Sequence, residues 1–347
     1  MKFINKASLL LLAGVLSIYG CTGGKSEKKN AVTSENTVVS KPSPVVGNET
    51  ALLLKELKEG GDYVNTKQYP SMIKASLVNG ASGGKNLIID LRSKTEYSAG
   101  HIKGAVNKKF EELPSWFESG IKPFEFEKII LVCDDGQLSC YTTSLLRLKG
   151  YGNVYAMRWG MSAWNKQLAE KGWLKGLSGK FESQLDTVTN NKPEPKTMPE
   201  LKTGLTTGKE VSDARFSKVF AEGAAGVFIN AEEVFANPSN YFIINLERKD
   251  KYIDGHIPGA IRYKPEATLG VIDELSTIPM DKTVVIYCST GHTSAFATAY
   301  LRLFGYDAKT LKYGNNSFMH NRMIAKREAL SWLPFSEEDV NSFPLVK

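Results

Sequence analysis

The sequence has few of the residues that build metal sites and disulfide frameworks. It contains four cysteines and four histidines in 347 residues, and no two cysteines have the CxxC spacing. The histidines complete no ligand pattern with the cysteines, and they are His101, His256, His292 and His320. We therefore expect no structural zinc site, no other metal and no cofactor.

A membrane-spanning run and a cluster of one charge are also lacking. The apolar run Ala7 to Gly20 is shorter than the ~20 residues of a bilayer-spanning helix. The formal net charge of +7 comes from 44 Lys and Arg against 37 Asp and Glu, and these charges are spread along the chain. Because no basic stripe with interleaved aromatic residues occurs, we expect no nucleic-acid partner. The mild basic excess favours anionic small molecules or lipid head groups.

The first 20 residues have the features of a signal peptide. Lys2 and Lys6 precede the apolar run, which ends directly before Cys21, an arrangement typical of export signals. The end of this run resembles a bacterial lipoprotein signal, in which the cysteine becomes lipidated. The resemblance implies a lipid anchor at Cys21 and a place in the bacterial cell envelope, at the outer membrane facing the periplasm. An ordinary secretory signal with a free Cys21 is the alternative.

Residues 21–55 are predicted to be a disordered tether. The stretch from Thr22 to about Thr50 consists mainly of Gly, Ser, Lys, Asn, Thr and Pro, with few large apolar residues. Such a composition buries too little apolar surface to offset the entropy lost on ordering.

The remaining sequence contains one domain twice. The motif Tyr97–Ala105, with Gly-His-Ile-Lys-Gly-Ala at its end, recurs 155 residues later as Tyr252–Ala260, and Cys133 recurs with the same offset as Cys288. We therefore predict a first domain over residues 56–180 and a second domain with a C-terminal tail over residues 225–347. Residues 181–224 are predicted to be a linker that contains a helix near Val211 to Glu222.

Each copy alternates predicted strands and helices. In the first copy the strands are Asn86–Leu91, Ile129–Val132 and Asn153–Met157, and the helices are Pro70–Val78 and Ser139–Lys149. In the second copy the strands are Tyr241–Leu246, Val284–Tyr287 and Ala308–Lys312, and the helices are Ala231–Ala236 and Ser294–Phe304. This alternation predicts an α/β fold with a parallel sheet flanked by helices in each copy, and ligands at the carboxyl ends of the strands.

A cysteine follows a buried apolar strand in each copy. Cys133 and Cys288 both stand between such a strand and a short loop that leads into a helix. Backbone N–H groups of the loop and the positive end of the helix favour the reactive thiolate. A nucleophilic thiol is one interpretation, and a small apolar core residue is the other. The position at the carboxyl end of a strand favours the nucleophile.

The combined motifs resemble the rhodaneses, a family of sulfurtransferases. They are Asp-x-Arg at Asp90 to Arg92, Tyr-x-x-Gly-His-Ile-x-Gly-Ala at Tyr97 to Ala105, and an apolar strand that ends in Cys-x-x-Gly. The resemblance implies that a cysteine takes a sulfane sulfur from a small donor, becomes a persulfide and passes the sulfur to a thiophilic acceptor. At the fifth position after the cysteine, where the family commonly has Arg, the chain has Leu138 and Thr293. The missing arginines argue against thiosulfate as the natural donor.

The two cysteine loops differ in charge. Cys133 is followed by Asp134 and Asp135, which we expect to raise the pKa of its thiol and to repel anionic donors. The first loop continues with Gly136, Gln137 and Leu138. The second loop, the expected substrate-binding loop, is uncharged and rich in hydroxyls, and comprises Ser289, Thr290, Gly291, His292, Thr293 and Ser294.

Cys288 is therefore the expected main catalytic residue, and Cys133 the weaker one. The hydroxyls of its loop can donate to sulfur, and His292 can add charge or carry a proton. The alternative role of these hydroxyls is to cap the following helix.

For His101, His256 and Cys140 we expect structural rather than chemical roles. His101 and His256 are expected to fix a turn by hydrogen bonding, and Cys140 is expected to be a small buried residue rather than a resolving thiol. Two rival functions stay open: a catalytically silent scaffold or sulfur-compound binder, motivated by the missing arginines, and a redox protein that uses Cys133 with Cys140. The sequence identifies no protein partner.

Overall fold

The computed structural model describes residues 43–81 and 84–347. The predicted signal peptide, Cys21 and most of the predicted tether lie outside the described residues. None of the helices in the described part combines the length and the hydrophobicity needed to cross a membrane.

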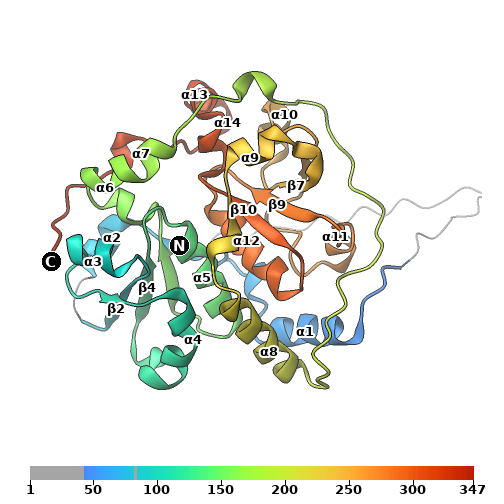
Figure 1. The fold of residues 1–347 in the computed structure, drawn as a ribbon, viewed down its shortest axis with the longest axis horizontal. Helices are drawn as coiled ribbons and strands as arrows, with labels where there is room; N and C mark the ends of the chain where they lie inside the picture. Colours follow the sequence, from blue (N-terminus) through green and yellow to red (C-terminus); the bar gives the residue numbers. More distant parts are fainter. Residues whose placement is uncertain (1–42, 82–83) are drawn as a thin grey trace, which may run out of the picture. The chain divides into compact units, whose positions relative to one another are not determined.

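Each copy contains one five-stranded parallel sheet (Figure 1). The strand orders are β1-β5-β4-β2-β3 and β6-β10-β9-β7-β8. The first sheet consists of β1 Met72–Ile73, β2 Asn86–Asp90, β3 Val106–Asn107, β4 Lys128–Val132 and β5 Val154–Met157. The second consists of β6 Phe228–Ile229, β7 Tyr241–Asn245, β8 Ile261–Arg262, β9 Thr283–Tyr287 and β10 Ala308–Leu311. The predicted α/β fold with two parallel sheets is confirmed, whereas the two-residue edge strands were too short to show periodicity.

Helices flank both sheets. In the first half they are α1 Asn48–Glu59, α2 Ala75–Gly80, α3 Lys94–Ala99, α4 Leu113–Ser115, α5 Gln137–Leu148, α6 Lys166–Lys171 and α7 Trp173–Gly176. In the second half they are α8 Gly208–Ala221, α9 Ala231–Ala236, α10 Lys249–Asp254, α11 Ile272–Leu275, α12 His292–Leu303, α13 His320–Ala325 and α14 Arg327–Leu330. The helix predicted over Pro70–Val78 begins later, at Ala75, because β1 occupies part of that stretch.

The predicted tether is wrong over its last residues. Helix α1 begins at Asn48, and its side chains Leu53 and Leu57 are buried in the core. This apolar stripe offsets the ordering entropy that the polar residues before it cannot offset. Residues 48–55 therefore belong to the folded part of the chain.

The linker between the copies is attached to the fold along its length. The carboxylate of Glu49 accepts the N–H groups of Thr203 and Gly204 at 2.7 and 2.8 Å, and the hydroxyl of Thr50 donates to the carbonyl of Pro199 at 2.6 Å. Beyond these contacts the linker forms α8, which packs on α1 and confirms the helix predicted near residues 211–222.

The segment that follows each copy crosses onto the other copy. After the first copy, Asp186 pairs with His256 in an antiparallel bridge, and after the second, Val346 pairs in the same way with His101. We call these two segments, around Asp186 and around Val346, the crossing arms. Each crossing arm covers the Gly-His-Ile turn of the opposite copy. The C-terminal tail, predicted as part of the second domain, lies in space against the first. The described residues accordingly belong to one compact unit.

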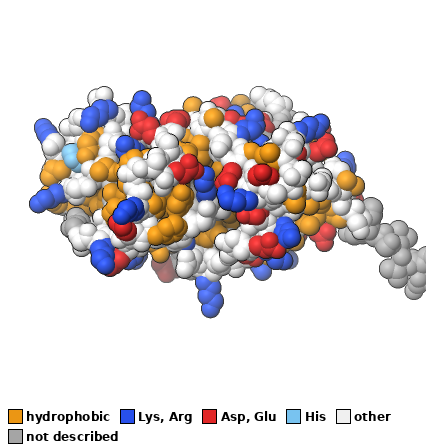
Figure 2. All heavy atoms as spheres, turned by 90° about the horizontal axis from the view of Figure 1, so that it is seen from below, with side chains coloured by type: hydrophobic (Ala, Val, Ile, Leu, Met, Phe, Trp, Pro, Cys, Tyr) orange, Lys and Arg blue, Asp and Glu red, His pale blue; other side chains and the backbone are white. Residues whose placement is uncertain are grey.

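Helices α5 and α12 form the centre of the contact between the copies (Figure 1). Their buried side chains join one hydrophobic cluster that also contains Cys133 and Cys288. Inside this contact the hydroxyl of Ser144 donates to the carbonyl of Phe296 at 2.9 Å. On the outer face drawn in Figure 2, acidic and basic side chains lie interspersed.

Behind each cysteine, two consecutive residues with positive φ angles form a turn, and the residue after them bonds to the carbonyl of the cysteine. In the second copy Tyr313 and Gly314 have φ angles of 61° and 54°, and the next N–H, from Asn315, donates to the carbonyl of Cys288 at 3.0 Å. A Cβ on Gly314 would lie 2.1 Å from that carbonyl oxygen. Residues 159–160 repeat this arrangement in the first copy, which explains why both copies have glycine there.

Replacing Gly314 by Ala should cost more stability than the same change at a glycine with equal backbone strain but open space. Gly259 has a φ of 76° and nothing near its Cβ position. We expect Gly259→Ala to lower the free energy of unfolding by about 1 kcal/mol. Gly314→Ala adds a steric clash and should cost about 3 kcal/mol. Urea denaturation measures both values, and equal losses would contradict the steric explanation.

Candidate active site

The two cysteines occupy equivalent places at the carboxyl ends of the sheets. Cys133 follows β4 and Cys288 follows β9, and their exposed fractions are 3% and 5%. Each loop ends in a glycine in the left-handed region, Gly136 with φ 87° and Gly291 with φ 75°, which is the N-cap of the next helix. The sequence therefore predicted the position of both thiols within the fold.

The loop of Cys133 surrounds its sulfur with donors. The N–H groups of Gly136 and Ser139 donate to Sγ at 3.2 and 3.3 Å, and the hydroxyl of Ser139 lies at 3.6 Å. The thiol itself donates to Oδ1 of Asp135 at 3.7 Å. The first two contacts favour a thiolate, whereas the last favours the protonated thiol.

The balance of these effects keeps Cys133 protonated. Burial and then the carboxylate of Asp135 raise the pKa of its thiol, and together they outweigh the hydrogen bonds from Ser139. The predicted rise of this pKa near the aspartates is thus confirmed, with burial as the larger cause. The nearby guanidinium of Arg92 is bound to Asp90 at 2.6 Å and to the carbonyl of Gly100.

The loop of Cys288 contains no charged side chain. The sulfur contacts the hydroxyl of Ser294 at 3.8 Å, and that hydroxyl lies 2.6 Å from Oγ1 of Thr310. Oγ1 of Thr290 accepts the N–H of His292 at 3.4 Å, at the start of α12. The hydroxyl of Thr290 therefore contacts the start of α12, whose N-cap residue Gly291 receives no side-chain cap. Ser289 and Thr290 are buried, and Thr293 is half-buried.

Two charged residues missed by the sequence analysis lie against this loop. The ammonium of Lys251 is 3.4 Å from Oγ of Ser289, 3.6 Å from Oε2 of Glu247 and 4.6 Å above the ring of Trp332. The hydroxyl of Ser289 donates to Oε1 of Glu247 at 2.6 Å. Burial raises the pKa of Glu247, and the charge of Lys251 opposes that rise.

A comparison of the copies contained the signal for these residues. Glu247 stands where the first copy has Arg92, and Lys251 stands where it has Glu96. The signs of both charges are therefore exchanged between the copies. Their meeting at the Cys288 loop depends on the contact between α10 and that loop, which only the tertiary structure creates.

The expectation that His292 adds charge or carries a proton at Cys288 is wrong. Its side chain is buried and packs against Trp159 and Trp173. Nε2 donates to the carbonyl of Asp135, in the first copy, at 2.9 Å. Burial lowers the pKa of His292 to about 3, so the ring is neutral at physiological pH and cannot supply positive charge.

Two further residues of the predicted first loop make structural contacts. Gln137 is fully buried and bonds to the second copy, and Leu138 packs against the shared core. Asp134 is exposed beside the loop. Although its side chain reaches solvent, the protein atoms packed around the Asp134 carboxylate, followed by the charges of Glu96 and Asp135, raise its pKa to about 7.

The predicted structural roles of the two turn histidines are confirmed. Nδ1 of His101 donates to the carbonyl of Tyr97 at 3.0 Å, and Nδ1 of His256 donates to that of Tyr252 at 2.8 Å. Each ring also stacks on the same tyrosine.

Cys140 is fully buried, as predicted for a small core residue. In the described part of the chain, Cys133, Cys140 and Cys288 are all free thiols. Among residues 43–81 and 84–347 no group of three metal-ligating side chains is present.

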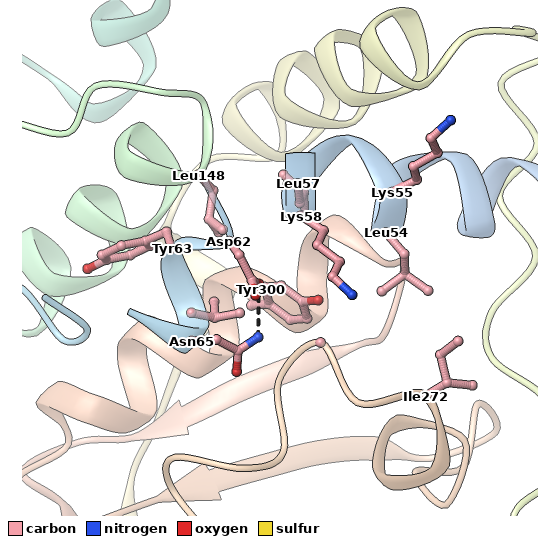
Figure 3. A pocket seen from close by; sticks show the side chains of 12 residues that line it. Leu54, Lys55, Leu57, Lys58, Asp62, Tyr63, Asn65, Leu148, Ile272 and Tyr300 are labelled. Atoms are coloured by element: carbon pink, nitrogen blue, oxygen red, sulfur yellow. Dashed lines mark hydrogen bonds between the residues drawn. The ribbon is translucent and has the colours of Figure 1, made fainter. Parts of the chain in front are cut away.

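A cavity of about 280 Å³ lies away from both cysteine loops. Its walls come from α1, the turn after it, the loop before α11 and Tyr300 of α12. Figure 3 shows Leu54 and Lys58 of α1 on the side of Tyr300, whereas Lys55 points away. Because neither cysteine lines it, this cavity does not mark the site of the predicted chemistry.

Comparisons with known proteins identify a family. The family described as Rhodanese-like domain matches residues 74–167 and 230–321, more than half of the chain. The tRNA uridine(34) hydroxylase of Rickettsia canadensis is 31% identical over 104 residues, which are 29% of this chain and 39% of that protein. The enzyme of the same name from Aster yellows witches'-broom phytoplasma is 28% identical over 110 residues, 30% of this chain and 36% of that protein.

The chain therefore covers well under half the length of these relatives. Among solved structures, thiosulfate sulfurtransferase from Pseudomonas aeruginosa matches with a TM-score of 0.28 and 15% identity, over 75% of this chain and 46% of that chain. A rhodanese-related protein from Thermoplasma volcanium matches with a TM-score of 0.25 and 18% identity, over 35% of this chain and 97% of that chain. Scores this low carry no argument about substrate or mechanism.

Replacing Asp135 by Asn should make Cys133 more reactive. The change removes the charge that raises the pKa of this thiol, and the amide oxygen can still accept the N–H of Gln137, now at 2.8 Å from the carboxylate. We expect iodoacetamide to alkylate Cys133 about tenfold faster at pH 8. Mass spectrometry of peptides measures this rate, with Cys288 as the internal reference. An unchanged rate at Cys133 would assign its low reactivity to burial alone.

Proposed function

Because the chain belongs to the rhodanese family and carries two rhodanese-like domains, we propose that it is a sulfurtransferase that acts mainly through Cys288. The thiolate of Cys288 attacks the sulfane sulfur of a small donor. A bond forms between Sγ and that sulfur, and the donor's sulfur bond breaks, leaving its electron pair on the departing group. A thiophilic acceptor then attacks the outer sulfur of the persulfide, takes it and releases the thiolate.

The charges around the two cysteines are the observation that carries the choice of Cys288. Near Cys133 the cations Arg92 and Lys312 are outnumbered by carboxylates, namely Asp90, Glu96, Asp134 and Asp135. The equivalent positions near Cys288 hold one anion and one cation, Glu247 and Lys251, and otherwise neutral residues. A persulfide carries negative charge on its outer sulfur, so the neutral surroundings disfavour it less.

Lys251 compensates in part for the missing loop arginine. Its ammonium lies at the Cys288 loop, close to Ser289, and its side chain is 8% exposed. A cation with little access to water interacts strongly with an anion that enters the same site. Lys251 would therefore attract an anionic donor to Cys288 as a single charge rather than as a two-pronged guanidinium.

Taken alone, the first copy fits the alternative of a catalytically silent domain better than it fits an active sulfurtransferase. Burial and Asp135 hold the Cys133 thiol in its protonated form, which is unreactive toward a sulfur donor. A sulfurtransferase in which only the second copy reacts and the first copy has a structural role agrees with both the neutral Cys288 loop and the protonated Cys133 thiol. A silent binder would lack persulfide chemistry at both sites.

The proposed location follows from the N-terminal sequence alone. Lys2, Lys6 and the apolar run before Cys21 support export and lipid attachment in a bacterial envelope, at the outer membrane facing the periplasm. The membrane would then be a partner through the lipid on Cys21, while the sulfur donor and acceptor are small molecules.

Cys288 should be the residue that gains sulfur. After incubation with thiosulfate or an inorganic polysulfide, we expect one added sulfur atom on the wild type and on Cys133→Ser, and none on Cys288→Ser. Intact-protein mass spectrometry under non-reducing conditions measures the addition. Sulfur on Cys288→Ser but not on Cys133→Ser would reverse the assignment, and no sulfur on any form with any donor would favour the silent binder.

Removing the charge of Lys251 should slow loading from an anionic donor. We expect Lys251→Met to load sulfur from thiosulfate at least about tenfold more slowly than the wild type, because the cation at the loop is lost. Lys249→Met is the matched control, since Lys249 is exposed on the same helix. Reactions quenched at successive times and measured by mass spectrometry give the rates of sulfur loading. Equal rates for the two variants would exclude Lys251 from donor binding.

A further inference from the structure

Gln137 and His292 occupy the same position in the two copies, and each reaches into the other copy. Both are the first residue of the helix that follows a cysteine loop, α5 for Gln137 and α12 for His292. Both side chains are fully buried, with exposed fractions of 0%. The hydrogen bonds of both side chains go to the opposite copy, so the role in substrate binding expected for His292 does not describe its contacts.

The amide of Gln137 completes the backbone of the Cys288 loop. Its Nε2 donates to the carbonyl of Leu311 at 3.2 Å and to that of Gly291 at 3.4 Å. Its Oε1 accepts the N–H of Tyr313 at 2.9 Å. Gly291 is the N-cap of α12, and residues 311–313 form the end of β10 and the closing turn behind Cys288. One side chain of the first copy therefore ties together both sides of the loop of the second.

The imidazole of His292 makes the reciprocal contact. Nε2 donates to the carbonyl of Asp135, two residues after Cys133, at 2.9 Å. The same carbonyl accepts the indole N–H of Trp173 at 2.8 Å. The carbonyl of Asp135 is therefore bound by one residue of the second copy and one of the first.

The two glycines at the loop ends leave room for these contacts. A Cβ on Gly291 would lie 2.2 Å from Nε2 of Gln137, and a Cβ on Gly136 would lie 2.6 Å from Nε2 of His292. The glycines therefore serve both the left-handed backbone and the close approach of the opposite copy.

We propose that Gln137 is a positioning residue for the Cys288 loop, so that the first copy is a structural part of the second copy's active site. Without this amide, the carbonyl of Leu311 and the N–H of Tyr313 would lose their hydrogen-bond partner, while the carbonyl of Gly291 would keep only the N–H of Ala295 and the hydroxyl of Thr310. Buried polar groups without partners are strongly disfavoured, so the loop would move to find other partners. The proposal rests on the assignment of persulfide chemistry to Cys288, and it adds that this chemistry needs both copies.

The experiment uses Gln137→Met in the full chain. Methionine has a similar size but makes none of the three hydrogen bonds, which limits the loss of packing. Ser144→Ala is the matched control, because it removes another buried hydrogen bond between α5 and α12, from Ser144 to Phe296, that does not touch a cysteine loop. His292→Gln tests the reciprocal contact at the Cys133 loop.

Two readouts separate positioning from a general loss of stability. Hydrogen exchange of peptides that cover residues 288–294 and 311–315 should be about tenfold faster in Gln137→Met and unchanged in Ser144→Ala. Sulfur loading of Cys288 should slow about tenfold with the donor KM changed less than about twofold, because the misplaced loop affects the reaction more than the encounter.

Two results would overturn the proposal. One is that Gln137→Met speeds exchange equally in residues 133–137 and 288–294, and the other is that this variant loads sulfur at the wild-type rate. His292→Gln should alter exchange in residues 133–137 and leave residues 311–315 unchanged, and the opposite pattern would also overturn it. If the wild type gains no sulfur from any donor, the proposed function fails, while the exchange pattern still decides whether Gln137 holds the loop.

Discussion

The packing of α5 against α12 is the contact on which both cysteine loops depend. Each helix begins at the residue after a loop glycine, so fixing the two helices against each other also fixes the two loops. Their shared core includes both thiols, and Gln137 and His292 bond across the contact at the loops themselves. The environment of either cysteine is therefore a property of the pair of copies.

Duplication has preserved the backbone of the site and changed its charges. Both copies retain the parallel sheet, the left-handed loop glycine and the closing turn that receives the cysteine carbonyl. The side chains around this common frame differ in sign, with Arg92 and Glu96 in one copy and Glu247 and Lys251 in the other. Because a persulfide is an anion, this difference affects reactivity directly while leaving the fold unaffected. Two backbone N–H groups donate to the sulfur of Cys133. Hydrogen bonding to sulfur therefore favours a thiolate in the first copy, whereas the surrounding charges favour it in the second.

The crossing arms make the two copies inseparable in a second way. The bridges from Asp186 to His256 and from Val346 to His101 place the end of each copy on the turn of the other. Their histidines in turn bond and stack on tyrosines of the same motif. The predicted domain boundaries describe the repeat in the sequence, but the folded unit exchanges a segment across each boundary.

The sequence by itself determined the α/β class, the repeat, the long central strands and the place of both cysteines. These features depend on local periodicity and on matched motifs, which a single chain displays directly. The tertiary structure alone decided that His292 and Gln137 face the opposite copy, that Lys251 reaches the Cys288 loop and that α1 belongs to the fold. Those contacts join residues far apart in the chain, and the burial that sets the pKa of His292 or Cys133 exists only after the copies have packed together.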